Sequence, residues 1–314
     1  MDLVFGPVPS RRLGRSLGID PIPLKTCSWN CVYCQLGRTG HPTCERARYV
    51  EEADVVEAVR RSLDRVGEPA VDWLTFVGSG EPTLHARLGW MLREVKQLTS
   101  LPVAVITNGS LLHREDVREE LLPADAVMPS LAAGNQRLFS KIHRPLPCAG
   151  YGRQLEGLRR FRECYAGPLW IEVMLLRGLN DSEDALRELA EVLESIAPDE
   201  VHLVLPDRPP SLEWVRPTDE EGVMRATAIL GRQLRVVHPQ HGRFDPASYA
   251  STADAILAVV TRHPMRDAEL IRMLGGPPVE SDVRDALDRL HREGHVQPVE
   301  RQGERFWGPA EGRY

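Results

Sequence analysis

Three cysteines stand close together near the start of the chain, at Cys27, Cys31 and Cys34. Their C-x3-C-x2-C spacing lets three thiolates reach one metal centre from a single loop, and soft ligands of this kind suit an iron–sulfur cluster or zinc. Zinc would need Cys44 as a fourth ligand, although four-cysteine zinc sites usually consist of two close pairs. A ferredoxin-type cluster would need a fourth cysteine soon after the third, and Gln35-Leu36-Gly37 does not supply one. The spacing therefore predicts a metal centre that takes three thiolates from this loop.

The elements that must position these cysteines alternate short β-branched runs with amphipathic helical stretches, from residue 16 to about residue 236. Six strands are expected, at Leu17–Asp20, Val71–Val77, Val103–Thr107, Ala126–Ser130, Leu169–Leu176 and Glu200–Leu205. Strands separated by helices are parallel, because a parallel pair needs a long crossover. A partial (β/α)6 TIM-like barrel over residues 1–236 fits better than a doubly wound sheet, since the suggestive clusters follow the carboxyl ends of strands, where barrels build their sites.

Charge and composition exclude several classes of protein. The 314 residues carry a net charge of -6, which is not the balance of a protein that coats nucleic acid. No apolar run approaches the roughly 20 residues of a membrane-spanning helix, and the start does not resemble a signal peptide, so we expect a cytoplasmic location and no membrane partner. The other cysteines, Cys44, Cys148 and Cys164, are too sparse for a disulfide scaffold and are expected to be ordinary thiols.

The last quarter of the chain predicts a second, small domain. Residues 237–250 are expected to form a linker that includes His238 and His241. Residues 251–314 then show three helical stretches and a hairpin in the order of a winged helix. Neutralisation of phosphates supplies much of DNA affinity, whereas this domain has 9 arginines against 11 acids, with acids concentrated on the expected recognition helix. We therefore expect it to dock a protein, a peptide or a substrate, and DNA binding is disfavoured.

The cysteine loop, with Tyr33 before its last cysteine, resembles the signature of the radical S-adenosylmethionine (radical SAM) enzymes. The resemblance implies that the three thiolates bind three irons of a [4Fe–4S] cluster and that S-adenosylmethionine (SAM) chelates the fourth iron. It also implies that the reduced cluster passes an electron to SAM, which releases methionine and a 5′-deoxyadenosyl radical that abstracts hydrogen from a substrate. An electron donor such as flavodoxin or ferredoxin is then expected as a partner.

The same resemblance assigns SAM-binding roles to residues at the strand ends. The turn Gly78-Ser79-Gly80-Glu81-Pro82-Thr83, an ordinary turn when taken alone, is similar to the family's Gly-Gly-Glu-Pro motif, in which Glu81 would accept a charge-assisted hydrogen bond from the methionine ammonium. Leu176 resembles the residue that packs on the adenine, with plain core as the alternative. The implied SAM contacts are Tyr33, Gly78, Ser79, Gly80, Glu81, Thr107, Asn108, Ser130 and Leu176.

Phe5–Gly18 and Pro206–Pro210 are similar to a bacterial and archaeal subgroup related to the radical SAM enzymes that make the tricyclic wyosine base of tRNA. Those enzymes carry a second cluster on upstream cysteines and a lysine that holds pyruvate, whereas residues 1–24 contain neither residue type. The substrate therefore stays unidentified, with a nucleotide, a tRNA base or a peptide as candidates. Seven basic residues against three acids in residues 1–50 fit an anionic substrate or a solvated loop equally well.

A second hypothesis comes from a different class of protein. It is a transcriptional regulator in which a metal cluster acts as the sensor and the winged helix reads DNA. This hypothesis predicts salt-sensitive binding to duplex DNA and no turnover of SAM.

Overall fold

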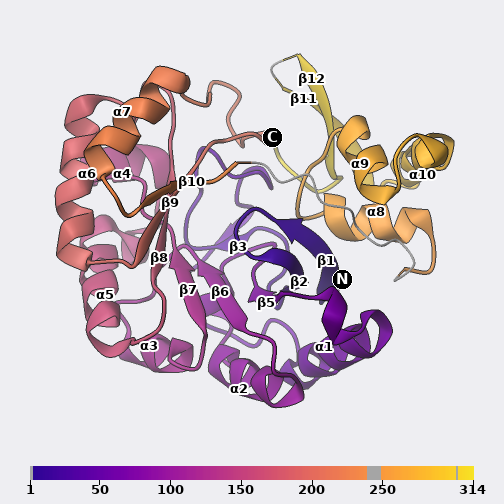
Figure 1. Cartoon of the computed structure of the whole chain (residues 1–314), viewed down its shortest axis with the longest axis horizontal. Coiled ribbons are helices and arrows are strands. Elements are labelled where there is room, and N and C mark those ends of the chain that lie inside the picture. The colour runs from indigo at the N-terminus through magenta and orange to yellow at the C-terminus, as the bar shows by residue number, and fades with distance from the viewer. Residues whose placement is uncertain (1–2, 239–248, 302) are drawn as a thin grey trace.

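The computed structural model describes residues 3–238, 249–301 and 303–314. Its central feature is a curved wall of strands (Figure 1). A five-stranded sheet has the order β1-β2-β5-β6-β7, and a three-stranded sheet has the order β10-β9-β8. Parallel bridges from Val127 to Leu169 and from Ser130 to Glu172 join β7 to β8, so that the two sheets continue into each other. The strands are β1 Val4–Ser10, β2 Gly14–Ile19, β5 Trp73–Phe76, β6 Val103–Thr107, β7 Ala126–Pro129, β8 Trp170–Met174, β9 Glu200–Val204 and β10 Leu234–Val236.

All six expected strands are present, and they run parallel from β2 to β9 as predicted. Two further strands extend the wall at its edges. β1 pairs with β2 in the antiparallel sense. The sequence did not predict β1 because it contains Pro7 and Pro9, and proline is rare inside strands. β10 has three residues and pairs with β9 in parallel, and it is too short to show a period.

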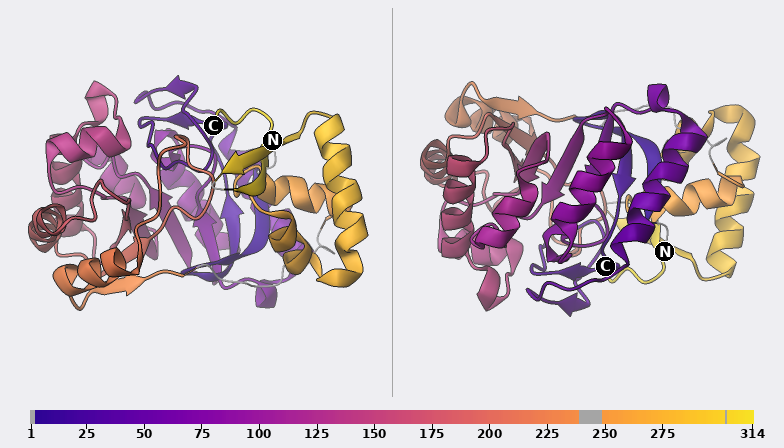
Figure 2. Two further views of the ribbon diagram at one scale, coloured as in Figure 1. Left: turned by 90° about the horizontal axis from the view of Figure 1, so that it is seen from above. Right: turned by 90° about the horizontal axis from the view of Figure 1, so that it is seen from below.

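Helices lie along the outer face of the wall (Figure 2). Most of them bury an apolar stripe against the strands, whereas α4 packs Phe139 and Ile142 against the cysteine loop. In α1 the buried stripe is Val55, Val56, Val59 and Leu63, as the spacing predicts, and each such side chain stabilises the fold by roughly 1.5–3 kcal/mol. The helices are α1 Glu52–Val66, α2 Leu88–Leu98, α3 Glu115–Leu121, α4 Gln136–His143, α5 Tyr151–Cys164, α6 Glu183–Ile196 and α7 Glu220–Leu230.

The C-terminal module, residues 249–314 without the undescribed Gln302, follows the expected order of three helices and a hairpin. The elements are α8 Thr252–Val260, α9 Asp267–Leu274, α10 Glu280–Arg292, β11 Val296–Arg301 and β12 Glu304–Pro309. The three helices and the hairpin share one apolar core, which includes Ile256, Leu270, Leu287 and Trp307. The predicted linker lies largely in residues 239–248, outside the described residues, and so does His241.

The C-terminal module packs beside the β1–β2 edge of the wall (Figure 1). Arg262, just after α8, donates from Nε to Oδ2 of Asp20 at 2.8 Å, and both side chains are buried. The same guanidinium lies 4.7 Å from the ring centroid of Phe5 in β1. At the end of the chain, the Tyr314 hydroxyl donates to the Gln35 carbonyl at 3.2 Å. The module is thus attached directly to the loops that carry the predicted site.

Two short strands, β3 Thr26–Cys27 and β4 His41–Pro42, brace the cysteine loop. The chain after β4 carries Cys44, which forms a disulfide with Cys148, so the expectation of two ordinary thiols was wrong. Spacing could not reveal this bond because the two cysteines are 104 residues apart. They meet because the Trp29 indole donates to the Ala149 carbonyl at 3.0 Å, which holds the turn after α4 against the loop.

No helix within the described ranges combines the length and apolar character that a membrane crossing would require.

Candidate active site

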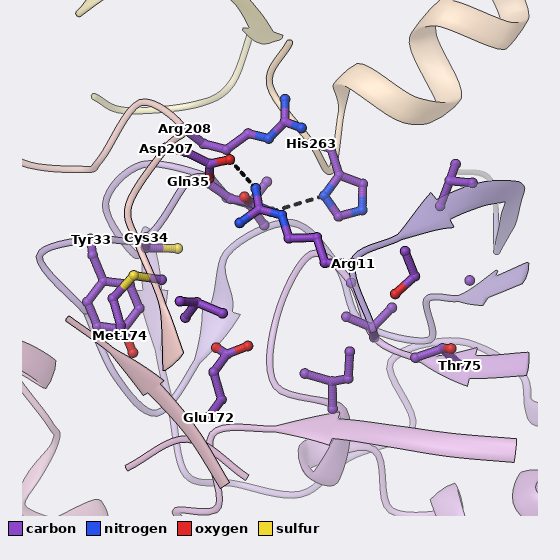
Figure 3. Close-up of a pocket in the computed structure, with 18 of the residues that line it drawn as sticks. Arg11, Tyr33, Cys34, Gln35, Thr75, Glu172, Met174, Asp207, Arg208 and His263 are labelled. Atoms are coloured by element: carbon purple, nitrogen blue, oxygen red, sulfur yellow. Dashed lines mark hydrogen bonds and ion pairs between the residues drawn. The ribbon is translucent and has the colours of Figure 1, made fainter. Parts of the chain in front are cut away.

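A cavity of about 420 Å³ lies where the carboxyl ends of the parallel strands meet (Figure 3). Ten of the predicted site residues line it: Cys27, Cys31, Tyr33, Cys34, Gly78, Gly80, Glu81, Thr107, Asn108 and Ser130. Its far wall belongs to the C-terminal module, through Val259, His263, Met265, Glu269, Arg272 and Met273. The strand ends and the C-terminal module therefore enclose one chamber together.

The cysteine loop is fixed by backbone hydrogen bonds to the end of α4. The amide of Asn30 donates to the His143 carbonyl at 3.0 Å, and the amide of Val32 donates to the Ile142 carbonyl at 2.9 Å. Within the loop, the Cys34 amide donates to the Cys31 carbonyl at 3.1 Å, which turns the chain between the second and third cysteines. These bonds place three free thiols at the wall of one cavity.

Each of the three thiols has a nitrogen neighbour. Lys25 Nζ lies 3.0 Å from Cys34 Sγ, and His143 Nδ1 lies 3.3 Å from Cys31 Sγ. Asn108 Nδ2 lies 3.5 Å from Cys27 Sγ. These contacts suit thiolate sulfurs, which accept hydrogen bonds from such groups.

Burial decides the charge state of these groups in the absence of a metal. It raises the pKa of Cys27 to about 11 and holds the pKa of Cys31 well above its ordinary value. It also lowers the pKa of His143 to about 3, so that imidazole is neutral. Burial lowers the pKa of Lys25 as well, but the nearby thiolates outweigh it and leave that pKa above its ordinary value. Metal coordination would supply the positive charge that buried thiolates need.

The donor set fits an iron–sulfur cluster better than zinc. Cys44 is bonded to Cys148 and cannot serve as the fourth zinc ligand. Across the described ranges, no three His, Cys, Asp or Glu side chains gather closely enough to hold a single metal ion. A cluster, by contrast, spreads three thiolates over three separate irons, which agrees with sulfurs that share a cavity without meeting at one point. Cys27, Cys31 and Cys34 are thus the residues that would hold the cluster.

Glu81 lies at the centre of a buried hydrogen-bond network, with 2% of its surface exposed. Its Oε1 accepts from the Thr83 amide at 3.0 Å, the Thr83 hydroxyl at 2.6 Å and the Thr107 hydroxyl at 2.5 Å. Its Oε2 accepts from the Asn108 amide at 2.6 Å. Burial raises the pKa of this carboxyl, although the four hydrogen bonds oppose that shift. The carboxylate links the chain after β5 to the end of β6. Its Oε2 accepts only one hydrogen bond from the described residues, so a lone pair is left that can accept from a further donor.

The glycines of the same turn are required by close packing against neighbouring chain. A Cβ at Gly78 would collide with the Asp20 carboxylate, and a Cβ at Gly80 would collide with the Thr26 carbonyl. Ser79 does not line the cavity, because its hydroxyl donates to Asp20 Oδ2 at 2.7 Å and its amide to Asp20 Oδ1 at 3.1 Å. These two hydrogen bonds hold the turn against Asp20.

Leu176 lies in the core, which is the alternative that the sequence left open beside packing on the adenine. Its side chain is 1% exposed and packs in an apolar cluster with Val32 and Ile142, and it does not line the cavity. The apolar residue of this segment that faces the cavity is Met174, the last residue of β8. Strand β8 ends at Met174, two residues before Leu176.

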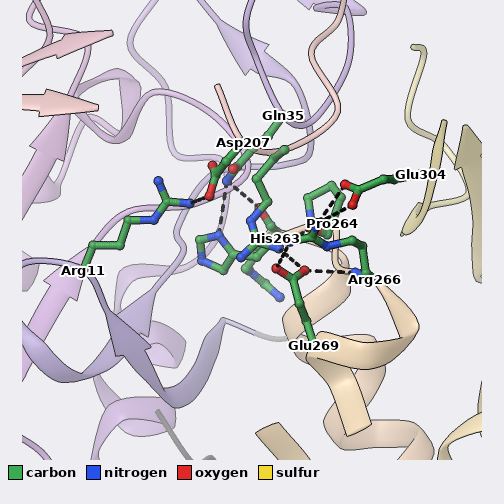
Figure 4. A network of polar contacts seen from close by, with 10 residues as sticks. Arg11, Gln35, Asp207, His263, Pro264, Arg266, Glu269 and Glu304 are labelled. Atoms are coloured by element: carbon green, nitrogen blue, oxygen red, sulfur yellow. Dashed lines mark hydrogen bonds and ion pairs between the residues drawn. The ribbon is translucent and has the colours of Figure 1, made fainter. Parts of the chain in front are cut away.

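Most basic residues near the cavity already have acidic partners. Arg11 pairs with Asp207 and Arg12 pairs with Glu172. Arg208 donates to the Pro264 carbonyl and lies 3.3 Å from Glu269, in a network that continues through His263 to Gln35 (Figure 4). The local positive charge of residues 1–50 is thus partly neutralised inside the protein.

Sequence reasoning missed Lys25, His143, Asp20 and Arg262 as members of the site. Lys25 and Asp20 carry a weak signal, because charged residues beside a cysteine loop or at the end of an apolar run are candidates for a site. His143 and Arg262 carry none, since only the tertiary structure brings them to the cysteine loop and to the Gly78–Thr83 turn.

The geometry of the site agrees with the similarity of this sequence to known proteins. The sequence matches the Radical SAM superfamily over residues 22–190, more than half of the chain, and the protein belongs to that superfamily. Among its relatives, UPF0026 protein MJ1312 of Methanocaldococcus jannaschii is 34% identical over 317 residues, which cover 98% of this chain and 96% of the relative. A UPF0026 protein of Helicobacter pylori strain 26695 is 32% identical, over 85% of this chain and 86% of the relative.

Solved structures show the same fold. A radical SAM methyltransferase from Sphaerobacter thermophilus has a TM-score of 0.54 and 21% identity, over 70% of this chain and 65% of that one. A structure of TYW1 with a bound lysine–pyruvate adduct has a TM-score of 0.53 and 21% identity, over 69% of this chain and 72% of that one. The protein is a radical SAM enzyme, and members of its superfamily use a [4Fe–4S] cluster and SAM.

Proposed function

We propose that Cys27, Cys31 and Cys34 hold the [4Fe–4S] cluster and that SAM lies between the cluster and the turn that carries Glu81. When bound, the cluster and SAM supply a 5′-deoxyadenosyl radical that abstracts hydrogen from a substrate. The observation that carries this proposal is the meeting of three free thiols and one buried carboxylate at a single cavity. Tyr33, Gly78, Gly80, Thr107, Asn108 and Ser130 complete the SAM-binding wall.

The chain's own residues would orient SAM. Glu81 accepts a charge-assisted hydrogen bond from the methionine ammonium through Oε2, and Met174 offers the apolar contact for the adenine. The strand ends line one side of the cavity and the C-terminal module lines the other.

The substrate enters between the strand ends and the C-terminal module. Arg11, Arg12 and Arg208 line this part of the cavity together with their acidic partners Glu172, Asp207 and Glu269, which supports a polar substrate that can pair with either charge. The resemblance of Phe5–Gly18 and Pro206–Pro210 to the subgroup related to wyosine-forming enzymes supports a nucleotide or a tRNA base as the first candidate, with a peptide as the second. In this proposal the C-terminal module is a winged helix used for docking, and a flavodoxin or ferredoxin supplies the electron.

The test is anaerobic reconstitution with iron and sulfide, followed by addition of dithionite and SAM. We expect a brown protein that forms 5′-deoxyadenosine. A colourless protein that retains one zinc and leaves SAM intact would reject the proposal. The substrate is then sought by comparing metabolites, tRNA nucleosides and peptides from cells with and without the protein, and by supplying the changed species to the reconstituted enzyme.

A further inference from the structure

Lys25 is held in an unusual place for a lysine. Only 6% of its surface is exposed, and its side chain reaches the cavity beside the cysteine loop. Its backbone adopts a φ of 61°, a conformation that side-chain-bearing residues rarely take. The Lys25 amide donates to the Ser79 carbonyl at 2.6 Å, which fixes this conformation against the Gly78–Thr83 turn.

The partner of the buried ammonium is a sulfur. Lys25 Nζ lies 3.0 Å from Cys34 Sγ, and none of the ion pairs found in the described part of the chain joins Lys25 to a carboxylate. A buried lysine is rare unless an opposite charge faces it. As a cluster ligand, Cys34 would be a thiolate and would supply this charge.

The three cysteines do not have equivalent neighbours. Cys31 and Cys27 face the His143 imidazole at 3.3 Å and the Asn108 side-chain amide at 3.5 Å. Cys34 faces an ammonium at a shorter distance. A charged donor makes a stronger hydrogen bond than a neutral one and also acts on the cluster through its full positive charge. Hydrogen bonds to the ligand sulfurs and local charge both set the potential of an iron–sulfur cluster.

We propose that Lys25 is a positioning and tuning residue that raises the reduction potential of the [4Fe–4S] cluster through its contact with Cys34, an inference that rests on the proposed function. One electron passes from a low-potential donor protein to the oxidised cluster, which becomes one unit more negative, and no proton leaves Lys25. The nearby ammonium stabilises this extra negative charge. Reduction by the donor is therefore more favourable than it would be beside a neutral side chain.

The experiment compares Lys25→Met, which removes the charge at similar length, with Lys25→Arg, which keeps it. Lys96→Met is the matched control, because Lys96 pairs with Asp125 on the outer side of the barrel. Each protein is reconstituted without oxygen, its iron and sulfide are counted, and its cluster is titrated with a redox mediator series under electron paramagnetic resonance. We expect Lys25→Met to lower the ratio of reduced to oxidised cluster at least tenfold at a fixed potential, which corresponds to 59 mV for a one-electron couple.

Lys25→Arg and Lys96→Met should keep the parent potential within experimental scatter. An unchanged potential in Lys25→Met with full iron content overturns the inference. If SAM affinity falls tenfold in that variant while the potential stays, Lys25 is a SAM ligand and the inference is wrong. If Lys25→Met and Lys25→Gln both fail to assemble a cluster while Lys25→Arg succeeds, the lysine serves assembly, which also overturns it. A parent protein without cluster or SAM cleavage would instead reject the proposed function.

Discussion

Glu81→Gln tests two roles of one side chain. Glu81 accepts four hydrogen bonds within the protein, and it is proposed to accept one from the SAM ammonium. The carboxylate has four donors around it, three on Oε1 and one on Oε2. A glutamine amide offers one oxygen and one NH2 group. If its oxygen replaces Oε1, the NH2 group faces the Asn108 amide, so that two donors meet and one buried backbone N–H loses its acceptor.

An unsatisfied buried donor costs about 1–3 kcal/mol, and the loss of charge on the remaining hydrogen bonds adds to this cost. Removal of a buried charge offsets part of it. We therefore expect the free energy of unfolding to fall by about 1–3 kcal/mol in Glu81→Gln. The lost hydrogen bond to the SAM ammonium is worth roughly 1.5–3 kcal/mol, so SAM affinity should fall about tenfold to a hundredfold.

The assay is urea unfolding of the reconstituted protein, together with SAM binding and iron content. Glu81 ligates no iron in the proposal, so the cluster should survive. Thr83→Val is the control, because it removes one donor and leaves the carboxylate charged. A variant that loses stability but binds SAM like the parent would show that Glu81 is only a structural acceptor. Unchanged stability would refute the hydrogen-bond argument itself.

Three further predictions concern other parts of the site. Cys31→Ala should lose cluster and SAM cleavage together, whereas Cys164→Ala, which removes an exposed thiol on α5, should keep both when iron and 5′-deoxyadenosine are measured. Arg262→Met should lower the free energy of unfolding by about 3–5 kcal/mol because it leaves Asp20 as an unpaired buried charge, and adding Asp20→Asn should recover part of it in chemical denaturation. Burial lowers the pKa of His263 to about 3. Between pH 6.5 and 3 the unfolded chain therefore binds more protons than the folded one, and the free energy of unfolding decreases as the pH is lowered, by up to about 1.4 kcal/mol per pH unit. His263→Phe should remove that part of the slope between pH 7 and 5, and an unchanged slope would contradict it.

The sequence predicts the parts of this molecule that depend on local pattern. Periodicity located the strands β2 and β5 to β9, and spacing located the three cavity thiols, because both signals are contained in short segments. The three helices and hairpin of the C-terminal module were found for the same reason.

Contacts between distant segments could not be predicted in this way. The bond between Cys44 and Cys148 depends on how α4 packs on the cysteine loop. Met174 lines the cavity and Leu176 lies in the core, and the apolar run alone does not show which of the two does which. Lys25 shows the same limit, since its charge is visible in the sequence but its contact with Cys34 follows from a backbone turn.

The ion pair between Asp20 and Arg262 has a consequence for folding. The two residues are 242 positions apart, and Asp20 also holds Ser79 through two hydrogen bonds. A barrel that folded before the C-terminal quarter emerged would leave Asp20, beside the Gly78–Thr83 turn, without its Arg262 partner. Barrel and C-terminal module should therefore unfold in one cooperative transition, and the Gly78–Thr83 turn should reach its final arrangement only once Arg262 has been synthesised.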